Sequence, residues 1–330
     1  MRAAVVTEFG PILSHRLGSL PDPVPAAGEV LVAIKAAAVN YVDSLVVTGK
    51  YQFLPERPFA PGKLPAGVVS ALGTGVQDLK VGDRVLTLAE QGGYAERIAV
   101  PARACFKLPA SMSFVDAASM ALVYDTAWFA LRERARLRAG ERVLVLGGTG
   151  GVGLAAIQLA KALGAKVLAG VANPAKASLA LGAGAGAIVD VSKENLRDSL
   201  REQVFQNNNG NGVDIVLDPI GGDAFDAALR ALAWRGRLVV IGFAAGRIPD
   251  VKTNYLLIKN IEVSGLQVSD YRKRTPDLMA RCMDEIFALF EAGKLKPAPT
   301  VTRPLEDFAQ ALQDVVDRRV SGRVVLVPNP

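Results

Sequence analysis

The chain has 330 residues, enough for about two domains at roughly 150 residues each. Half of the residues are hydrophobic and 21% are charged, which is typical of a globular protein and excludes extended disorder. The net charge of +6 is mildly basic. Because the basic run Arg272-Lys273-Arg274 is too short for a nucleic-acid-binding arm, we expect it to be a solvated loop.

The rarest residues exclude several kinds of site. The chain has one histidine, His15, and two cysteines, Cys105 and Cys282. A structural zinc ion needs about four Cys or His ligands, so this site is excluded, and a catalytic zinc site built on Cys and His is not expected. His15 has no nucleophile motif beside it, so we expect a surface or hairpin residue rather than part of a hydrolase triad.

Cysteine usage and hydropathy indicate where the protein works. Two widely separated cysteines suggest free thiols in a reducing compartment. The apolar run after Met1 is too short for a signal peptide, and no stretch of about 18 apolar residues lacks charge. We therefore expect a soluble, cytoplasmic protein without a membrane span.

Short strands separated by turn residues dominate the first third of the chain. This spacing predicts a compact, partly open β-barrel. The expected strands are Ala3–Val6, Glu29–Ala37, Gly67–Leu72, Arg84–Leu88 and Tyr94–Val100.

Strands alternate with helices in the middle of the chain, which is typical of a parallel sheet covered by helices on both faces. The expected strands are 142–146, 166–171, 187–189, 213–217, 237–241 and a longer one at 261–266; the expected helices are 152–163, 176–181 and 194–205. An amphipathic segment, 279–291, follows. The tail should contain a helix, 305–317, and a strand, 323–327, which returns to the first domain because it lacks a βα partner.

A glycine motif follows the first strand of this alternating region. Gly148, Thr149, Gly150, Gly151, Val152 and Gly153 match the pattern G-x-G-x-x-G and open a helix. We expect Gly148 to allow the tight turn, Gly150 to let the backbone approach a pyrophosphate, and Gly153 to let helix and strand pack closely. The helix N-terminus then offers free N–H groups to the phosphates, which predicts dinucleotide binding.

The second strand of this region indicates which dinucleotide binds. An NAD site usually carries Asp or Glu at this strand end, where it binds the ribose 2′-hydroxyl. Here the segment 171–176 has no carboxylate, whereas Asn173 can donate a hydrogen bond and Lys176 can attract a phosphate. The sequence therefore favours NADP.

Several segments together resemble the medium-chain dehydrogenase/reductase superfamily, and more narrowly its zinc-free NADPH:quinone oxidoreductase, or zeta-crystallin-like, group. The resemblance spans nearly the whole chain. It rests on Val39-Asn40-Tyr41-Val42-Asp43 with Gly49-Lys50-Tyr51, Gly92-Gly93-Tyr94-Ala95-Glu96, residues 136–145 before the glycine motif, and the segments 214–222, 241–246 and 254–260.

The resemblance implies an α/β fold with a Rossmann doubly wound parallel sheet and a GroES-like, partly open β-barrel catalytic domain. The catalytic domain would comprise residues 1–122 completed by 293–330, and the dinucleotide-binding domain residues 123–292. It also implies NADPH in the cleft between the domains, no metal, and a homodimer. Two positions depart from the group: Lys63-Leu64 replaces a segment that often carries Glu, and residues 189–191 lack a tyrosine found near the adenosine phosphate.

The same resemblance indicates catalytic residues. Tyr51 aligns with the proton donor of related enoyl reductases, although it could instead only line the cleft. Asn40 and Asp43 align with residues that face the nicotinamide and the substrate; Asn40 could donate to an acceptor carbonyl, while Asp43 more often holds a helix start.

Further residues are candidates for the nicotinamide end of the cofactor. Thr126 matches a group residue close to the nicotinamide, and Phe243 and Leu266 lie at strand ends where backbone groups could hold the carboxamide. Tyr255 and Lys259 fit the Y-x-x-x-K pair of short-chain dehydrogenases, but the mid-chain glycine motif and Gly242 in the serine's place argue against that use.

Three functions remain open. The first is NADPH-dependent reduction of a quinone, which needs only a few hydrogen-bond donors because the product charge is delocalised. The second is reduction of an enone or enoyl thioester, which also needs a proton donor. The third is a non-catalytic NADPH-binding protein with weak RNA binding. The expected partners are a small-molecule quinone or activated alkene and a second copy of the chain, with nucleic acid and membrane not expected.

Overall fold

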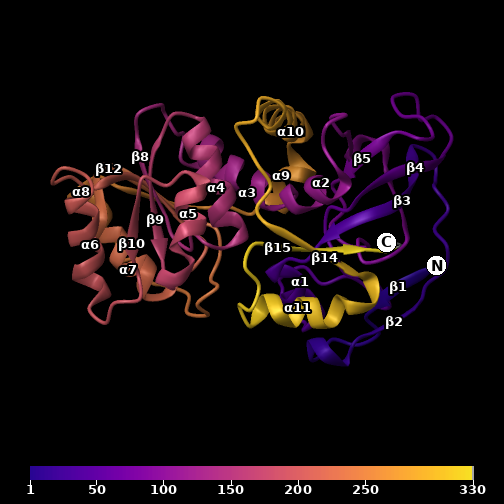
Figure 1. Cartoon of the computed structure of the whole chain (residues 1–330), viewed down its shortest axis with the longest axis horizontal. Helices are drawn as coiled ribbons and strands as arrows, with labels where there is room; N and C mark the ends of the chain where they lie inside the picture. Colours follow the sequence, from indigo (N-terminus) through magenta and orange to yellow (C-terminus); the bar gives the residue numbers. More distant parts are fainter. Residues whose placement is uncertain (329–330) are drawn as a thin grey trace. The chain divides into compact units, whose positions relative to one another are not determined.

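The computed structural model describes residues 1–328, which form two compact units (Figure 1). One unit contains Met1–Leu122 together with the chain from Pro297 onward, and the other contains Val123–Lys296. The sequence places the domain boundaries after residues 122 and 292. Asn329 and Pro330, the end of the predicted catalytic domain, lie outside the described residues.

A parallel sheet forms the centre of the second unit, with strands in the order β10-β9-β8-β11-β12-β13. The chain moves outward in one direction from β8 and then in the other from β11, so the sheet is doubly wound, and the predicted fold class is confirmed. The strands are β8 (Arg142–Val145), β9 (Lys166–Val171), β10 (Ala187–Asp190), β11 (Val213–Asp218), β12 (Leu232–Val240) and β13 (Glu262–Gly265).

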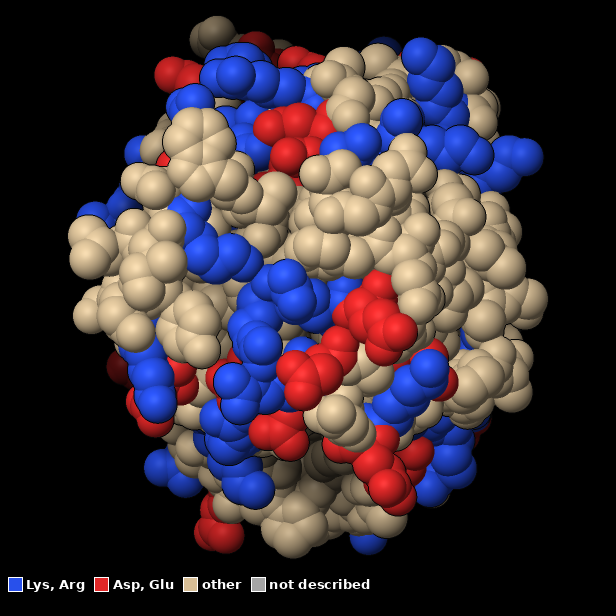
Figure 2. All heavy atoms as spheres, turned by 90° about the vertical axis from the view of Figure 1, so that its left-hand side faces the viewer, with Lys and Arg blue, Asp and Glu red and all other residues tan. Residues whose placement is uncertain are grey.

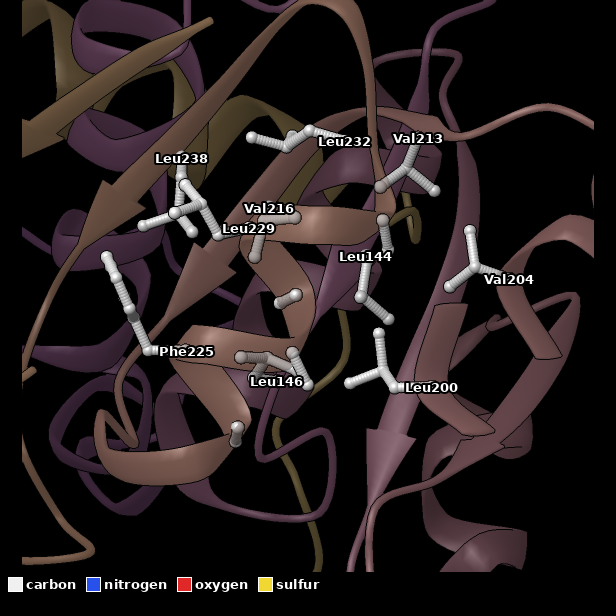
Figure 3. Packing of buried hydrophobic residues seen from close by; sticks show 14 of the residues in the cluster. Leu144, Leu146, Leu200, Val204, Val213, Val216, Phe225, Leu229, Leu232 and Leu238 are labelled. Carbon is white, nitrogen blue, oxygen red and sulfur yellow. The ribbon is translucent and has the colours of Figure 1, made fainter. Parts of the chain in front are cut away.

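Helices cover this sheet because its strands are apolar on both sides. Figure 3 shows Leu200 and Val204 of α6 and Phe225 of α7 packed around Leu144 and other strand residues, so α6 and α7 share one face. The helices of the unit are α3 (Val123–Trp128), α4 (Gly151–Ala162), α5 (Ala177–Ala183), α6 (Leu196–Gln206), α7 (Gly222–Ala231), α8 (Thr253–Lys259), α9 (Val268–Arg274) and α10 (Pro276–Glu291), with a π-helical segment at Phe129–Arg134.

The first unit contains a mixed sheet in the order β14-β15-β3-β4-β5-β7, with β6 also paired to β3. Val30, Val32 and Ile34 of β3 alternate with more exposed residues and are buried, as expected of a strand with one face on a core. The tail strand β15 pairs with β3. The strands are β1 (Arg2–Val5), β2 (Arg16–Ser19), β3 (Glu29–Ala38), β4 (Ala66–Leu72), β5 (Arg84–Thr87), β6 (Arg97–Pro101), β7 (Cys105–Lys107), β14 (Thr300–Pro304) and β15 (Arg323–Val327).

Short helices complete the first unit. They are α1 (Tyr41–Val47), α2 (Phe114–Met120) and α11 (Phe308–Val316). The β1–β2 hairpin joins the rest of the unit through isolated pairings, one of them between Ala3 and Ala95.

Two polar side chains, those of His15 and Arg272, are buried. His15 follows a short 3-10 turn in the connection of the β1–β2 hairpin and is buried, with no hydrogen-bond partner for Nε2 among the described residues, so of the two expected places it has the hairpin one and not the surface one. Arg272 is not in a solvated loop: it lies on α9 with a side chain that is 3% exposed. A single sequence does not reveal this, because the partner of Arg272 is Asp125, far away along the chain.

Candidate active site

The glycine motif forms the turn between β8 and α4, at the carboxyl edge of the parallel sheet. Gly147, one residue before the motif, has a φ of +63° and makes the tight turn that the sequence assigns to Gly148. A Cβ at Gly148 would lie 2.9 Å from the Cβ of Ala169, so this glycine is needed for contact with β9. A Cβ at Gly153 would lie 2.1 Å from the carbonyl oxygen of Gly147, which fits the expected close packing of helix and strand.

Gly150 differs from these neighbours because the protein itself does not require a glycine there. Its φ of −84° suits any residue, and a Cβ would meet only the Gly147 oxygen, at 3.4 Å. Gly150 is exposed and caps α4, where the first N–H groups lack partners within the helix. A missing side chain at an open helix start fits the close approach of a diphosphate, and the loop lies at the switch point between β8 and β11.

The rest of the motif follows from this turn. Thr149 stands between the two glycines of the loop, and Gly151 and Val152 begin α4. The amide of Gly150 donates to the Gly147 oxygen at 2.9 Å, which closes the loop and holds its remaining N–H groups in place.

Asn173 and Lys176 lie in the turn after β9. Asn173 caps a 3-10 turn (Pro174–Lys176), and its Oδ1 accepts the Ala175 amide at 3.0 Å. The side-chain amide nitrogen therefore stays the donor of Asn173 toward a ligand. Asn173 is exposed and Lys176 is partly exposed, so both can reach a nucleotide at this edge of the sheet.

The predicted nicotinamide contacts come from three other elements. Phe243 follows β12 and is 40% exposed, while Leu266 follows β13 and its amide donates to Val240 of β12 at 2.9 Å. These two residues therefore lie at the same carboxyl edge as the glycine turn. Thr126 lies on α3, which packs on α4; its amide donates to the Asp125 carboxylate at 2.6 Å.

Sequence reasoning missed Asp218, another polar group at this edge. It ends β11, and its Oδ1 accepts the amides of Ile220 and Gly221 at 2.8 and 2.9 Å. Burial raises the pKa of Asp218, and the backbone hydrogen bonds lower it. The carboxylate thus shapes the loop after β11.

In the first unit, Asn40 and Asp43 form the start of α1. The backbone amide of Asn40 donates to Asp43 Oδ2 at 3.0 Å, which is half of a capping box. Tyr94 donates its hydroxyl to the same Oδ2 at 2.7 Å. Arg323 of β15 donates to Asn40 Oδ1 at 2.7 Å, and Asn40 Nδ2 donates to the Ala38 carbonyl at 3.1 Å.

These contacts give Asp43 a structural role and leave Asn40 able to donate a hydrogen bond. Burial raises the pKa of Asp43, while the positive charge of Lys63 and the Tyr94 hydrogen bond lower it. Burial and the neighbouring Asp43 carboxyl raise the pKa of Tyr94 well above its usual value, so Tyr94 remains a donor. Asp43 is enclosed by its own helix start and by Tyr94, whereas Asn40 still has a second amide hydrogen to offer.

Tyr51 lies beside a buried cation. The Lys63 side chain is 5% exposed, and its Nζ lies 5.5 Å from the centre of the Tyr51 ring. Nζ donates to the Glu90 carboxylate at 2.8 Å and to the Glu90 carbonyl at 2.9 Å. Phe53 packs edge-on against Tyr51 at 6.2 Å between ring centres. In the sequence Lys63 stands out only as a departure from the group, and the structure buries its side chain beside Tyr51.

Two further features of residues 1–328 concern metal ligands and hydropathy. No three His, Cys, Asp or Glu side chains gather there as metal ligands. Within the same residues no single helix is long and apolar enough to cross a bilayer; the consecutive segments Phe114–Met120 and Val123–Arg134 meet that criterion only when taken together.

Comparison with protein families places both units. The family model described as zinc-binding dehydrogenase matches residues 151–285, and the model described as alcohol dehydrogenase GroES-like domain matches residues 26–110. A relative from Nematostella vectensis, quinone oxidoreductase-like protein 2 homolog, is 37% identical over 90% of this chain and 81% of its own length.

Solved structures agree with this placement. A mycobacterial protein in complex with NADPH is 34% identical with a TM-score of 0.91, covering 99% of this chain and 100% of the other. Escherichia coli quinone oxidoreductase in complex with NADPH is 30% identical with a TM-score of 0.91 over the same shares. The chain belongs to the medium-chain dehydrogenase/reductase superfamily, in its zinc-free quinone oxidoreductase group.

Proposed function

We propose that the protein is an NADPH-dependent oxidoreductase that reduces a quinone without a metal ion. The observation that carries this proposal is Gly150, whose missing side chain has no structural reason but leaves room for a diphosphate at the start of α4. The Escherichia coli relative named as a quinone oxidoreductase was solved with NADPH, which supports both the cofactor and the acceptor class.

This chain's own residues fit NADPH. The N–H groups at the start of α4, from Gly151 to Gly153, would hold the diphosphate, and Asn173 and Lys176 would hold the 2′-phosphate. Thr126, Phe243 and Leu266 would line the nicotinamide end. Bound NADPH supplies a hydride from C4 of its nicotinamide ring.

Reduction of a quinone requires few groups from the protein besides the NADPH site. The negative charge that forms on its oxygens is delocalised, so a few fixed donors suffice. In the first unit, Asn40 offers its second amide hydrogen, and the buried Lys63 ammonium group adds positive charge beside Tyr51.

Reduction of an activated alkene is the second candidate, and the position of Tyr51 favours it. Hydride addition to an enone or enoyl thioester leaves an enolate carbon that must take up a proton. Tyr51 carries a phenol and lies beside the Lys63 cation, and the only histidine, His15, belongs to the β1–β2 region.

Steady-state kinetics separate the two candidates. NADPH oxidation is followed with an ortho-quinone and with crotonyl-CoA as acceptors, and NADH serves as the cofactor control. We expect kcat/KM to be at least about tenfold higher for the quinone, a difference of roughly 1.4 kcal/mol. A higher value for crotonyl-CoA would make the protein an enoyl reductase.

The Tyr51→Phe variant tests the role of this residue. Because a positioned general acid contributes about 100-fold or more, the variant should lose about that factor in kcat on crotonyl-CoA. Its kcat on the quinone should stay within about twofold of wild type, since no carbon is protonated. Equal losses on both acceptors would show that Tyr51 shapes the pocket for either substrate.

We propose that the protein forms a homodimer joined through its second unit. Trp234, Leu257 and Ile258 are 69%, 79% and 72% exposed, and α8 follows β12 near the outer strand β13. Figure 2 looks onto the side that carries α6 and α8: uncharged areas lie there between groups of Lys/Arg and Asp/Glu, without one continuous basic surface. This distribution gives the RNA-binding alternative no support on that face.

Light scattering after size-exclusion chromatography tests the dimer. The wild type should elute with about twice the mass of one chain, because exposed apolar side chains of this size favour an interface. Leu257→Glu together with Ile258→Glu should yield monomers. Val301→Glu, at an exposed residue of β14, is the matched control and should remain dimeric. A monomeric wild type would contradict this assembly.

The proposed location is the cytoplasm. Both Cys105 and Cys282 are free thiols, which is typical of proteins in reducing compartments. Burial raises the pKa of Cys105 to about 12 and that of Cys282 well above its usual value, so neither is a reactive thiolate.

A further inference from the structure

The carboxyl end of β10 lies directly beside the predicted 2′-phosphate site at the end of β9. The two strands are parallel, with Asp190 opposite Val171, and the Val191 amide donates to the Val171 oxygen at 3.1 Å. Asn173 follows only two residues after Val171. Because neighbouring strands are about 4.8 Å apart, Asp190 brings a carboxylate to the site where Asn173 and Lys176 would bind a phosphate.

Asp190 is held firmly in this place. Its amide donates to Gln203 Oε1 at 2.8 Å, and Gln203 Nε2 donates to its carbonyl at 3.0 Å, so α6 fixes the backbone. Its Oδ1 accepts the Ser192 hydroxyl at 2.6 Å and the Ser192 amide at 2.9 Å.

The Asp190 carboxylate is charged near neutral pH and partly exposed. The Ser192 hydrogen bonds lower the pKa of Asp190, and the positive charge of Lys193 lowers it further, while burial has a smaller opposite effect. The side chain therefore presents a fixed negative charge to the edge of the sheet. A phosphate monoester carries close to two negative charges at this pH, so the two groups repel each other.

We propose that Asp190 is a specificity residue of the adenosine-ribose site, where its carboxylate weakens 2′-phosphate binding and allows NADH to compete with NADPH. Lys176 and Asn173 attract the phosphate from β9, and Asp190 opposes them from β10. A site with no acid after β9 and no acid after β10 would strongly prefer NADPH over NADH. The Asp190 carboxylate makes this preference smaller. This inference rests on the proposed NADPH site.

Isothermal titration calorimetry on Asp190→Asn tests the proposal without turnover. Asparagine keeps an oxygen for the Ser192 hydrogen bonds and removes only the charge. For a charge roughly 5–10 Å from a phosphate dianion at a solvent-exposed site, we expect the Kd for NADPH to fall about fivefold. The Kd for NADH should change less than about twofold. The fragments 2′,5′-ADP and 5′-AMP should repeat this difference, because they contain only the adenosine half.

The matched control is Glu262→Gln. Glu262 is an exposed acid of the same unit on β13, at the opposite edge of the sheet from β10. Its charge lies farther from the site than the Debye length of about 8 Å, so it should leave both Kd values unchanged. An unchanged NADPH-to-NADH ratio in Asp190→Asn, or an equal change in Glu262→Gln, would overturn the proposal. A wild type that binds neither nucleotide would instead overturn the proposed function.

Discussion

The Gly150→Ala variant should fold like the wild type and lose most of its affinity for NADPH. An alanine Cβ at this position meets only the Gly147 oxygen, at an ordinary contact distance of 3.4 Å, and the backbone φ of −84° suits alanine. The new methyl group would occupy the space through which a diphosphate approaches the start of α4. We expect the Kd for NADPH to rise about 100-fold, or about 2.7 kcal/mol, with a free energy of unfolding within about 1 kcal/mol of wild type.

Gly153→Ala is the companion variant, and it should fail for a different reason. Its Cβ would lie 2.1 Å from the Gly147 oxygen and 2.9 Å from the Gly148 Cα, both backbone atoms that cannot move without disturbing the turn. We expect a loss of about 3 kcal/mol in unfolding free energy, together with loss of NADPH binding. Calorimetric titration and thermal unfolding measure both quantities. Full NADPH affinity in Gly150→Ala would show that the diphosphate does not pass over this residue.

Replacing Arg272 by methionine should lower the stability of the second unit by about 3–5 kcal/mol. Arg272 donates through Nε and Nη2 to Asp125 Oδ2 at 3.1 and 2.6 Å, and the Arg272 and Asp125 side chains are 3% and 0% exposed. Removing one partner leaves an unpaired charge inside the protein, which is far more costly than losing a surface pair. For a unit of this size the melting temperature should fall by about 10 °C in scanning calorimetry.

Arg132→Met is the control for this experiment. Arg132 pairs with Glu285 in the same unit, but their side chains are 39% and 30% exposed, so the pair should contribute less than about 1 kcal/mol. If the two variants unfold at the same temperature, the burial of the Asp125–Arg272 pair does not matter for stability. Because the other oxygen of Asp125 accepts the Thr126 amide, Arg272→Met should also disturb this candidate nicotinamide contact.

The parallel-sheet unit is well predicted from the sequence because its signals are local. The strand at 166–171 agrees with β9 at both ends, and Gly164, with a φ of +86°, ends the preceding helix as expected. Errors occur where packing across the sheet decides the ends. β12 begins at Leu232 rather than at residue 237. β13, expected to span 261–266, contains only Glu262–Gly265.

Most strands expected in the first unit also lie close to their observed ends, but the partners of its polar groups are not predicted, for a physical reason. Asn40 and Asp43 are identified by resemblance, but their partners Tyr94 and Arg323 come from distant parts of the chain. The burial of Lys63 beside Tyr51 likewise depends on Glu90, a residue from another loop. Periodicity reports which face of an element is apolar, whereas these contacts depend on how several elements are arranged in three dimensions.

A single-turnover reaction tests whether the protein transfers a hydride from NADPH to a quinone without a metal ion. Wild-type protein is mixed with one equivalent of NADPH and an excess of ortho-quinone, with a chelator present, and the loss of nicotinamide absorbance is followed alongside quinone reduction. We expect one NADPH to be consumed for each quinone reduced, at a rate that the chelator does not change. Absence of NADPH consumption, or its loss on adding the chelator, would contradict a metal-independent NADPH:quinone oxidoreductase.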